Sequence, residues 1–300
     1  MSFADLQPLA PMIHAEANDY AAAATALSKR ALNVCRSVLD IPYGADYWQR
    51  LDLFLPAAPS EKPLPVFAFV HGGAWMSGCK EWLGVMAPSF VGLPCLFVSI
   101  SYRKAPQHRL SVQVADIIAA LAWIAGNIGQ YGGDPARLFV GGHSAGGNLA
   151  ALAALRPDLL ADGGVAADAI KGVLPLSASF DFRPDAETFD ETMRQVHAKV
   201  LDDPNRAAEL SPISHVANVR APFLIAWGER DFLRTLRQGP AMVDALRRHG
   251  ARVGAMVLAG DGHFDTSLRA ANANSDWVCA ALDLIADGRL PESGGPSARR

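Results

Sequence analysis

The chain has 300 residues, of which half are hydrophobic and 19% are charged, and its formal net charge is −3. This composition allows a large buried core in one or two domains, and the lack of a basic stripe argues against nucleic acid as a partner. Residues 1–30 lack a positive segment followed by an apolar core, and no uninterrupted apolar run of about 18 residues occurs. We therefore expect neither a secretory signal nor a membrane span.

Strands and helices are expected to alternate from about residue 47 onward, after an Ala-rich segment at 16–39 that could be a helix. Short apolar runs bounded by turn residues predict strands of a doubly covered parallel sheet. The expected strands are 47–55, 66–70, 96–100, 138–140, 173–176, 223–227 and 252–258. The expected helices are 81–92, 111–130, 148–155, 237–249 and 265–286. Repeated βα units of this kind predict an α/β fold with helices on both faces of the sheet.

The domain organisation follows from where this alternation holds. We expect residues 41–286 to form the main domain, with an irregular, polar insertion at 180–218. Residues 1–40 precede the sheet, so together with the insertion they could form a lid. Residues 287–300 are rich in Gly and Pro and are expected to be a flexible tail.

The clearest chemical signal is Gly142-His143-Ser144-Ala145-Gly146, a G-x-S-x-G pattern between an expected strand and helix. A nucleophilic serine must stand on a tight strand-to-helix turn, and glycines are needed where side chains would clash. The alternative is a glycine-rich turn with an ordinary helix-capping serine. The strand before the pattern and the helix after it favour Ser144 as a nucleophile.

A second motif, His71-Gly72-Gly73-Ala74-Trp75, directly follows the expected strand 66–70. Backbone N–H groups of such a loop, together with that of the residue after the nucleophile, can stabilise a developing oxyanion. We assign this role to Gly73, Ala74 and Ala145. The side chain of His71 is expected to order the loop, and that of His143 to point away from the reaction.

The acid and the base should follow the serine in chain order. Asp231 stands after the expected strand 223–227, where the carboxyl ends of the strands carry ligand chemistry in α/β sheets. Asp181 and Glu229 are the competing acids. His263 lies in a glycine-containing loop before the last expected helix, whereas its competitor His249 ends a helix. The preferred triad is Ser144, Asp231 and His263.

These motifs resemble the esterase and lipase branch of the α/β-hydrolase fold, and finer features resemble kynurenine formamidase (arylformamidase) and its bacterial relatives. The finer features are the HGGxW loop, Ser101-Tyr102-Arg103, Phe180-Asp181-Phe182-Arg183-Pro184, Leu210-Ser211-Pro212, Trp227-Gly228-Glu229 and His263-Phe264-Asp265. The resemblance covers roughly residues 40–285. Three features depart from the formamidases: Ala145-Gly146-Gly147 has the form common in general esterases, Ala74 is smaller than the usual residue, and 185–210 is long and polar.

The resemblance implies an α/β-hydrolase fold, with a mostly parallel central sheet, flanking helices, and a small lid from the N-terminal segment and the insertion after the sixth strand. It also implies hydrolysis of a carboxylic amide or ester, arylformamidase-like, through an acyl-enzyme and without metal or cofactor. Aromatic and apolar residues on loops beside the triad would bind a small aromatic substrate. They are Trp75, Met76, Tyr102, Phe180, Phe182, Phe232 and Phe264.

Three alternatives stay open at this point. The first is a general carboxylesterase for short acyl groups, the second a non-catalytic binding protein on the same fold, and the third carbon–carbon bond cleavage. Four cysteines occur singly and form no C-x-x-C pair, which fits reduced thiols in the cytoplasm and no zinc site. An edge strand near the N-terminus or the Ala-rich helix could mediate a homodimer.

Overall fold

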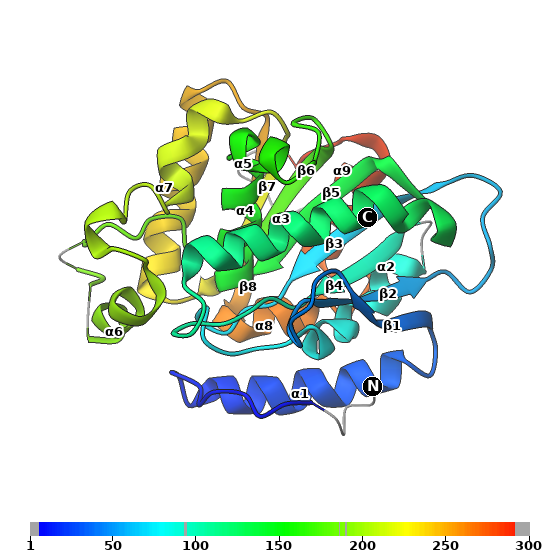
Figure 1. Cartoon of the computed structure of the whole chain (residues 1–300), viewed down its shortest axis with the longest axis horizontal. Helices are drawn as coiled ribbons and strands as arrows, with labels where there is room; N and C mark the ends of the chain where they lie inside the picture. Colours follow the sequence, from blue (N-terminus) through cyan, green and yellow to red (C-terminus); the bar gives the residue numbers. More distant parts are fainter. Residues whose placement is uncertain (1–5, 93–94, 186, 190, 292–300) are drawn as a thin grey trace.

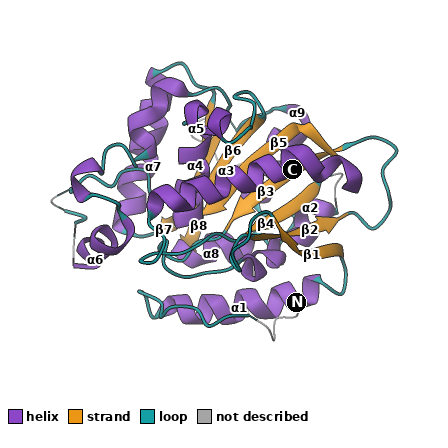
Figure 2. Ribbon diagram, in the orientation of Figure 1, coloured by secondary structure: helices purple, strands orange, loops and turns teal. Residues whose placement is uncertain are grey.

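The computed structural model describes residues 6–92, 95–185, 187–189 and 191–291. This part of the chain forms one eight-stranded sheet in the order β1-β2-β4-β3-β5-β6-β7-β8 (Figures 1 and 2). Strand β2 runs antiparallel to both β1 and β4, and the strands from β4 to β8 in that order are parallel. The strands are β1 (Arg36–Pro42), β2 (Arg50–Leu55), β3 (Leu64–Val70), β4 (Leu96–Ile100), β5 (Gly133–His143), β6 (Ile170–Leu176), β7 (Phe223–Arg230) and β8 (Val253–Gly262). The predicted α/β-hydrolase sheet is confirmed.

Helices cover both faces of this sheet (Figure 2). The α-helices are α1 (Glu16–Ala31), α2 (Ala87–Val91), α3 (Leu110–Asn127), α4 (Ala145–Ala154), α5 (Pro157–Asp162), α6 (Glu191–Val200), α7 (Leu233–Arg248), α8 (His263–Arg269) and α9 (Asp276–Asp287). The 3₁₀ helices are η2 (Lys80–Met86), η3 (Ile128–Tyr131), η4 (Pro204–Arg206) and η5 (Pro212–Asn218). The predicted βα alternation therefore holds from β3 to β8, with α6, η4 and η5 forming the insertion between β6 and β7.

The central strand β3 shows how the sequence builds the core, because all seven of its residues are buried. Alternate side chains point to opposite faces of a strand. Val66 and Val70 lie in one apolar cluster with α3, α4 and α7, whereas Phe67 and Phe69 lie in a second cluster with α2 and α9. Burial on both sides fixes the register, since a shift by one residue would exchange the two faces.

Several expected boundaries are wrong. The expected helix 265–286 is divided into α8 and α9, because the Asn-rich stretch 270–275 forms turns. The first half of the expected helix 81–92 is the 3₁₀ helix η2, and its second half is the α-helix α2. The Ala-rich segment is helical only to Ala31, and Arg36–Pro42 is instead the edge strand β1. Strand β1 is mostly half-buried, so it lacks the continuous apolar run that marks a central strand.

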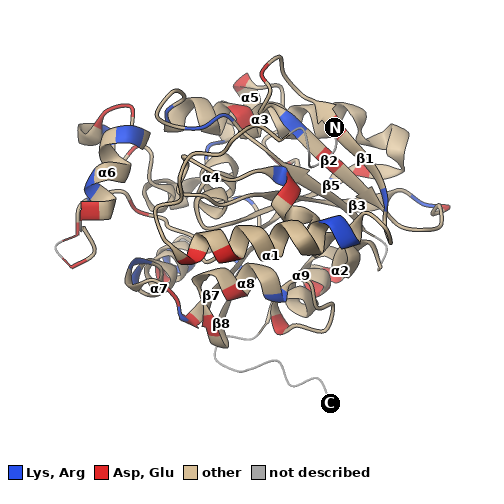
Figure 3. Cartoon of the chain, turned by 90° about the horizontal axis from the view of Figure 1, so that it is seen from below, with Lys and Arg blue, Asp and Glu red and all other residues tan. Residues whose placement is uncertain are grey.

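Helix α1 lies across the outside of the molecule beside α8 (Figure 3). Acidic residues occupy its first turn and basic residues its last, as the helix dipole favours. Its inner face is anchored by a small apolar cluster of Tyr20, Ala24, Cys79 and Trp82. The N-terminal segment is thus packed against the domain that carries the sheet.

One helical stretch among the described residues, Leu110–Tyr131, is long and apolar enough to cross a membrane. Half of its most apolar window is buried inside the fold, where α3 covers the sheet. Asp116, also on α3, is buried and bonded to the guanidinium of Arg103. The apolar character of this stretch is explained by its place in the core.

The first residues of the expected flexible tail are held in place. Arg252 donates to the carbonyl of Gly288 at 2.6 Å, and Arg289 pairs with Asp283 and Asp287. These contacts tie residues 288 and 289 to the domain, while the flexible tail stays a prediction and residues 292–300 lie outside the described residues.

Candidate active site

Ser144 stands on the tight turn between β5 and α4, with φ 55° and ψ −120°. This backbone conformation is strained for a residue with a Cβ. The neighbouring glycines make the turn feasible: a Cβ on Gly142 would lie 2.3 Å from the backbone of Gly146, and one on Gly146 would lie 2.2 Å from the carbonyl oxygen of Val70. The sequence prediction of a glycine-dependent turn at Ser144 agrees with this geometry.

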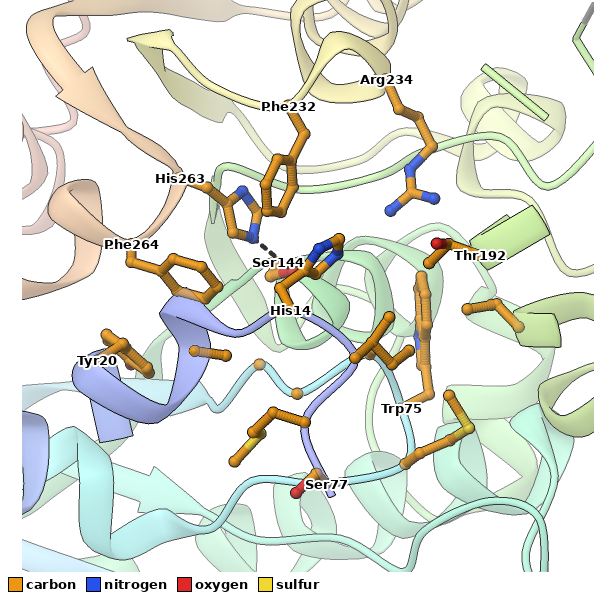
Figure 4. A pocket seen from close by; sticks show the side chains of 18 of the residues that line it. His14, Tyr20, Trp75, Ser77, Ser144, Thr192, Phe232, Arg234, His263 and Phe264 are labelled. Carbon is orange, nitrogen blue, oxygen red and sulfur yellow. Dashed lines mark hydrogen bonds between the residues drawn. The ribbon is translucent and has the colours of Figure 1, made fainter. Parts of the chain in front are cut away.

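The three residues of the predicted triad form one hydrogen-bonded chain. His263 Nε2 is 2.9 Å from Ser144 Oγ (Figure 4). His263 Nδ1 is 2.7 Å from Asp231 Oδ1. His263 begins α8, and Asp231 follows β7, so both come from the carboxyl end of the sheet. The imidazole side chain is 6% exposed and the carboxylate is fully buried. A serine, an imidazole and a carboxylate in this order are the parts of an activated nucleophile.

The carboxylate of Asp231 is held ionised. It accepts from the N–H of Phe232 at 2.7 Å and from that of Gly228 at 3.2 Å, in addition to His263. Burial raises the pKa of Asp231, but the hydrogen bond and the charge of His263 outweigh burial and bring the pKa from 3.8 down to about 2. An ionised carboxylate at this place orients the imidazole and stabilises it once it is protonated.

The competing acids and the competing histidine lie elsewhere. Asp181 pairs with Arg183, Glu229 accepts from the N–H of Gly260, and His249 is bonded to the carbonyl of Ala245 in its own helix. The alternatives that the sequence left open at the acid and base positions are thereby resolved in favour of Asp231 and His263.

The loop after β3 has three consecutive residues with positive φ: Gly73 at 124°, Ala74 at 52° and Trp75 at 61°. The Gly73 carbonyl accepts from the N–H groups of Met76 and Ser77, and a Cβ on Gly73 would lie 2.2 Å from the Ser77 oxygen. Gly73 and Ala74 line the cavity together with Ser144, and Ala145 follows Ser144 at the first turn of α4. The structure thus brings together the three residues predicted to form the oxyanion hole.

Two buried histidines support this loop and the triad. His71 Nδ1 is 2.6 Å from the carbonyl oxygen of Gly72, and its ring stacks on Tyr102 at 4.4 Å. His143 Nε2 is 2.9 Å from the carbonyl oxygen of His263. Burial lowers the pKa of His71 well below its usual value; burial and the charge of His263 lower that of His143 to about 3. Both rings are therefore neutral, and each donates a hydrogen bond to a backbone carbonyl. For His71 this agrees with the predicted role of ordering the loop.

A cavity of about 250 Å³ opens beside Ser144. Four of the seven predicted substrate-binding residues line it, namely Trp75, Met76, Phe232 and Phe264. Other walls come from the N-terminal segment, through residues 11–14, Ala17 and Tyr20, and from the insertion, through Glu187, Thr188, Thr192, Met193 and Val196. Both segments that were expected to form a lid therefore contribute walls, while their closing motion stays a prediction.

The other three predicted substrate-binding residues do not line this cavity, which corrects the sequence-based assignment. Tyr102 is fully buried behind His71, to whose carbonyl its hydroxyl donates. Phe182 packs against Trp75 with ring centroids 5.0 Å apart, and Phe180 is fully buried with its N–H bonded to Gln238. They follow strands that end near the site, but their side chains point into the core.

Sequence reasoning missed many residues of the cavity wall, and His14, Thr192 and Arg234 are among them. The ring of His14 lies tilted against that of Phe232 with centroids 4.6 Å apart, and Phe232 stacks on His263 at 4.2 Å. Arg234 lies in the first turn of α7, three residues after Asp231, so only its closeness in sequence to the predicted acid could have pointed to it. His14 and Thr192 come from segments without a local motif, and no sequence signal places them here.

Within the described residues, no group of three or more His, Cys, Asp or Glu side chains is arranged to hold a metal ion. The chemistry that this site can carry out with its own residues is acyl transfer through Ser144.

The chain is similar in sequence to a known protein family and to several named proteins. The sequence model of the alpha/beta hydrolase fold family matches residues 67–265. Esterase LipQ of Mycobacterium tuberculosis (strain H37Rv) is 34% identical over 260 residues, covering 81% of this chain and 60% of that protein. Esterase LipC of the same organism is 33% identical over 238 residues, covering 74% of this chain and 58% of that protein. The chain thus spans about three fifths of the length of these relatives.

A solved structure shows the same fold. The Pyrobaculum calidifontis esterase superposes with a TM-score of 0.73 at 20% sequence identity, covering 94% of this chain and 99% of that chain. At this identity the similarity concerns the fold alone.

Proposed function

Because the chain belongs to the alpha/beta hydrolase fold family, we propose that it is a carboxylic ester hydrolase that works through an acyl-enzyme on Ser144. The observation that carries the proposal is the hydrogen-bonded chain Asp231–His263–Ser144, which ends at the cavity. The names of the relatives LipC and LipQ, both esterases, support the same reaction class. A binding protein on this fold would not need an ionised carboxylate, an imidazole and a serine hydroxyl joined in series by hydrogen bonds.

In the proposed reaction, Ser144 Oγ attacks the ester carbonyl carbon while His263 Nε2 takes its proton. The N–H groups of Gly73, Ala74 and Ala145 stabilise the oxyanion of the tetrahedral intermediate, each donor being worth roughly 2.7–4 kcal/mol in such sites. The protonated imidazole, stabilised by Asp231, then protonates the leaving alcohol. A water molecule activated by the same imidazole releases the acid from Ser144.

A second candidate is hydrolysis of a small aryl amide, arylformamidase-like. It is favoured by the aromatic walls of the cavity, where Trp75, Phe232 and Phe264 offer flat apolar surface next to Ser144. The same triad would serve an amide, with His263 protonating the departing amine. The ester reading is preferred because the similar proteins carry esterase names.

The test compares the wild type with Ser144→Ala on p-nitrophenyl acetate, p-nitrophenyl butyrate and N-formyl-kynurenine. Ser214→Ala, at an exposed serine, is the matched control. Ester turnover that falls roughly 10⁴-fold or more in Ser144→Ala alone is expected. Faster turnover of the formyl amide than of the esters would favour the second candidate. If neither substrate class shows Ser144-dependent turnover, and a fluorophosphonate leaves Ser144 unlabelled, the hydrolase proposal is wrong.

A further inference from the structure

Ser177 is a strained residue directly after β6. Its φ is 50°, a left-handed backbone conformation that residues with a Cβ rarely adopt and that glycine adopts at little cost. Its side chain is fully buried, and its N–H donates to the carbonyl of Ala226 on β7 at 2.8 Å. A serine at such a position costs stability through its backbone, so we expect its hydroxyl group to have a use that glycine could not supply.

The hydroxyl group of Ser177 contacts both the acid and the base of the triad. Its Oγ is 2.9 Å from Thr266 Oγ1, and Thr266 Oγ1 donates to the carbonyl oxygen of His263, also at 2.9 Å. Burial raises the pKa of Asp231, whereas hydrogen bonds from His263 and Ser177 and the charge of His263 lower it to about 2. One buried hydroxyl group therefore joins the two segments that carry Asp231 and His263.

The hydrogens of this group can be assigned from the available acceptors. Ser177 Oγ carries one hydrogen, and an ionised carboxylate is a stronger acceptor than a hydroxyl oxygen. The hydrogen of Ser177 therefore goes to Asp231, and the hydrogen of Thr266 is shared by Ser177 Oγ and the carbonyl oxygen of His263.

The carboxylate of Asp231 gains from a donor on a second strand. Its Oδ1 accepts from His263 Nδ1 and from the N–H of Phe232, both at 2.7 Å, and its Oδ2 accepts from the N–H of Gly228 at 3.2 Å. Both backbone donors belong to β7 or to the turn after it, whereas Ser177 follows β6. A donor from this separate direction limits rotation of the carboxyl group, which would lengthen its contact with His263.

We propose that Ser177 is a positioning residue, which holds Asp231 and His263 in the alignment that proton transfer from the nucleophile requires. It acts on the carboxylate directly and on the backbone of His263 through Thr266. This inference rests on the proposed function, since alignment matters only if the triad carries out the reaction. Ser177 is fully buried and stands apart from the residues that line the cavity, so its effect should appear in kcat and not in KM.

Two substitutions separate the hydroxyl group from the backbone strain. Ser177→Ala removes the hydroxyl group and keeps the Cβ, and hence the strain, whereas Ser177→Gly removes both. We therefore expect Ser177→Gly to melt at a higher temperature than Ser177→Ala. In hydrolysis of p-nitrophenyl acetate, both variants should lose kcat by a similar factor, roughly 10- to 100-fold, with KM nearly unchanged, because a small misalignment of reacting groups has this effect on rate.

Substitutions at two other residues serve as controls. Thr266→Val loses the hydroxyl group and should also lower kcat, whereas Thr266→Ser keeps it and should retain most of the wild-type kcat. Ser89→Ala is the matched control and should leave kcat unchanged. It removes a buried serine hydroxyl that donates to the carbonyl of Ala270 at 2.8 Å, beyond the end of α8 opposite to His263.

A merely structural role of Ser177 predicts that activity follows stability, so that the more stable Ser177→Gly is as active as the wild type. That result overturns the proposal, as does a rise in KM with unchanged kcat, or an equal loss of kcat in Ser89→Ala. If the wild type shows ester turnover that depends on Ser144 and Ser177→Gly keeps its kcat, only the positioning role is wrong. If the wild type shows no such turnover, the proposed function fails and the positioning role fails with it.

Discussion

Replacing Asp231 by Asn tests how the triad carboxylate works, because the amide can lie in two ways. With its oxygen at the Oδ1 position it still accepts from His263 Nδ1 and from the N–H of Phe232, both 2.7 Å away in the wild type. Its NH₂ group then faces the N–H of Gly228, which loses a longer bond of 3.2 Å. The flipped amide loses the shorter bond from Phe232 and forces His263 into the tautomer that cannot accept the serine proton.

The first orientation costs less, so we expect the variant to keep the correct tautomer and to lose mainly the negative charge. The hydrogen bond and the charge of His263 lower the pKa of Asp231 although burial acts in the opposite direction, so the ionised carboxylate interacts favourably with the protonated imidazole. A hydrogen bond to a charged group is worth roughly 1.5–3 kcal/mol, so the loss of the charge should lower kcat by roughly 10- to 100-fold. A wrong tautomer would instead cost roughly 10⁴-fold.

The assay is kcat for p-nitrophenyl acetate at neutral pH, with Asp244→Asn, at an exposed position on α7, as the control. A loss between roughly 10-fold and 10³-fold supports the retained tautomer. A loss near 10⁴ contradicts the argument about the two orientations, and a loss below 10-fold contradicts the assignment of Asp231 as the triad acid.

Three further predictions concern residues around the site. Gly146→Ala should lower the free energy of unfolding by roughly 3 kcal/mol in urea titration, because its Cβ would lie 2.2 Å from the carbonyl oxygen of Val70. An unchanged urea midpoint would contradict this prediction, because it would show that the backbone shifts to accommodate the Cβ at little cost. Burial lowers the pKa of Lys104 from 10.5 to about 7. Between these pH values Lys104 is protonated in the unfolded chain but neutral in the folded one, so the free energy of unfolding of the wild type should rise with pH from about 7 to 10. Melting curves of Lys104→Met should lack this rise, and a wild type without it would contradict the pKa assignment. Tyr20→Phe should lower the free energy of unfolding by about 1 kcal/mol, measured by thermal unfolding, because it removes the buried hydrogen bond to Ser267. A melting temperature higher than that of the wild type would contradict this prediction.

The sheet could be predicted from the sequence because burial on both faces leaves a plain signal. Residues 66–70 form a continuous apolar run, residues 96–100 form one that only Ser99 interrupts, and both are strands in the structure. Strand β1 was missed because an edge strand needs only partial burial, and its sequence continues an Ala-rich stretch. The sequence predicts one helix at 265–286 where the structure has α8 and α9, because apolar residues recur on both sides of the turn at 270–275.

The triad could be predicted because its geometry depends on chain order and on glycines that tolerate close backbone contact. The position of a residue after a strand does not tell where its side chain points. Trp75 and Tyr102 both follow parallel strands, yet Trp75 lines the cavity and Tyr102 is buried against His71. Likewise, the contributions of His14 and Arg234 depend on how α1 and α7 pack, which local patterns do not specify.

Backbone strain is concentrated where the chemistry is proposed. Among the described residues, the non-glycine positions with positive φ are Asp40, Ala74, Trp75, Ser144 and Ser177. Ser144 and Ser177 directly follow β5 and β6, and Ala74 and Trp75 lie in the loop after β3. Each such conformation costs of order 1–3 kcal/mol and persists only when its surroundings enforce it.

The enforcement comes from adjacent buried strands. The N–H of Ser144 donates to the carbonyl of Leu176 at 2.9 Å, and the N–H of Ser177 donates to that of Ala226 at 2.8 Å, so each strained turn is bonded to the end of the next strand. The hydroxyl of Ser177 is 2.9 Å from Thr266 Oγ1, which donates to the carbonyl of His263. The nucleophile turn and the histidine loop are therefore linked through β6 and β7. Mutations that loosen the packing of these strands should displace Ser144 relative to His263, and thus reduce activity, before they unfold the domain.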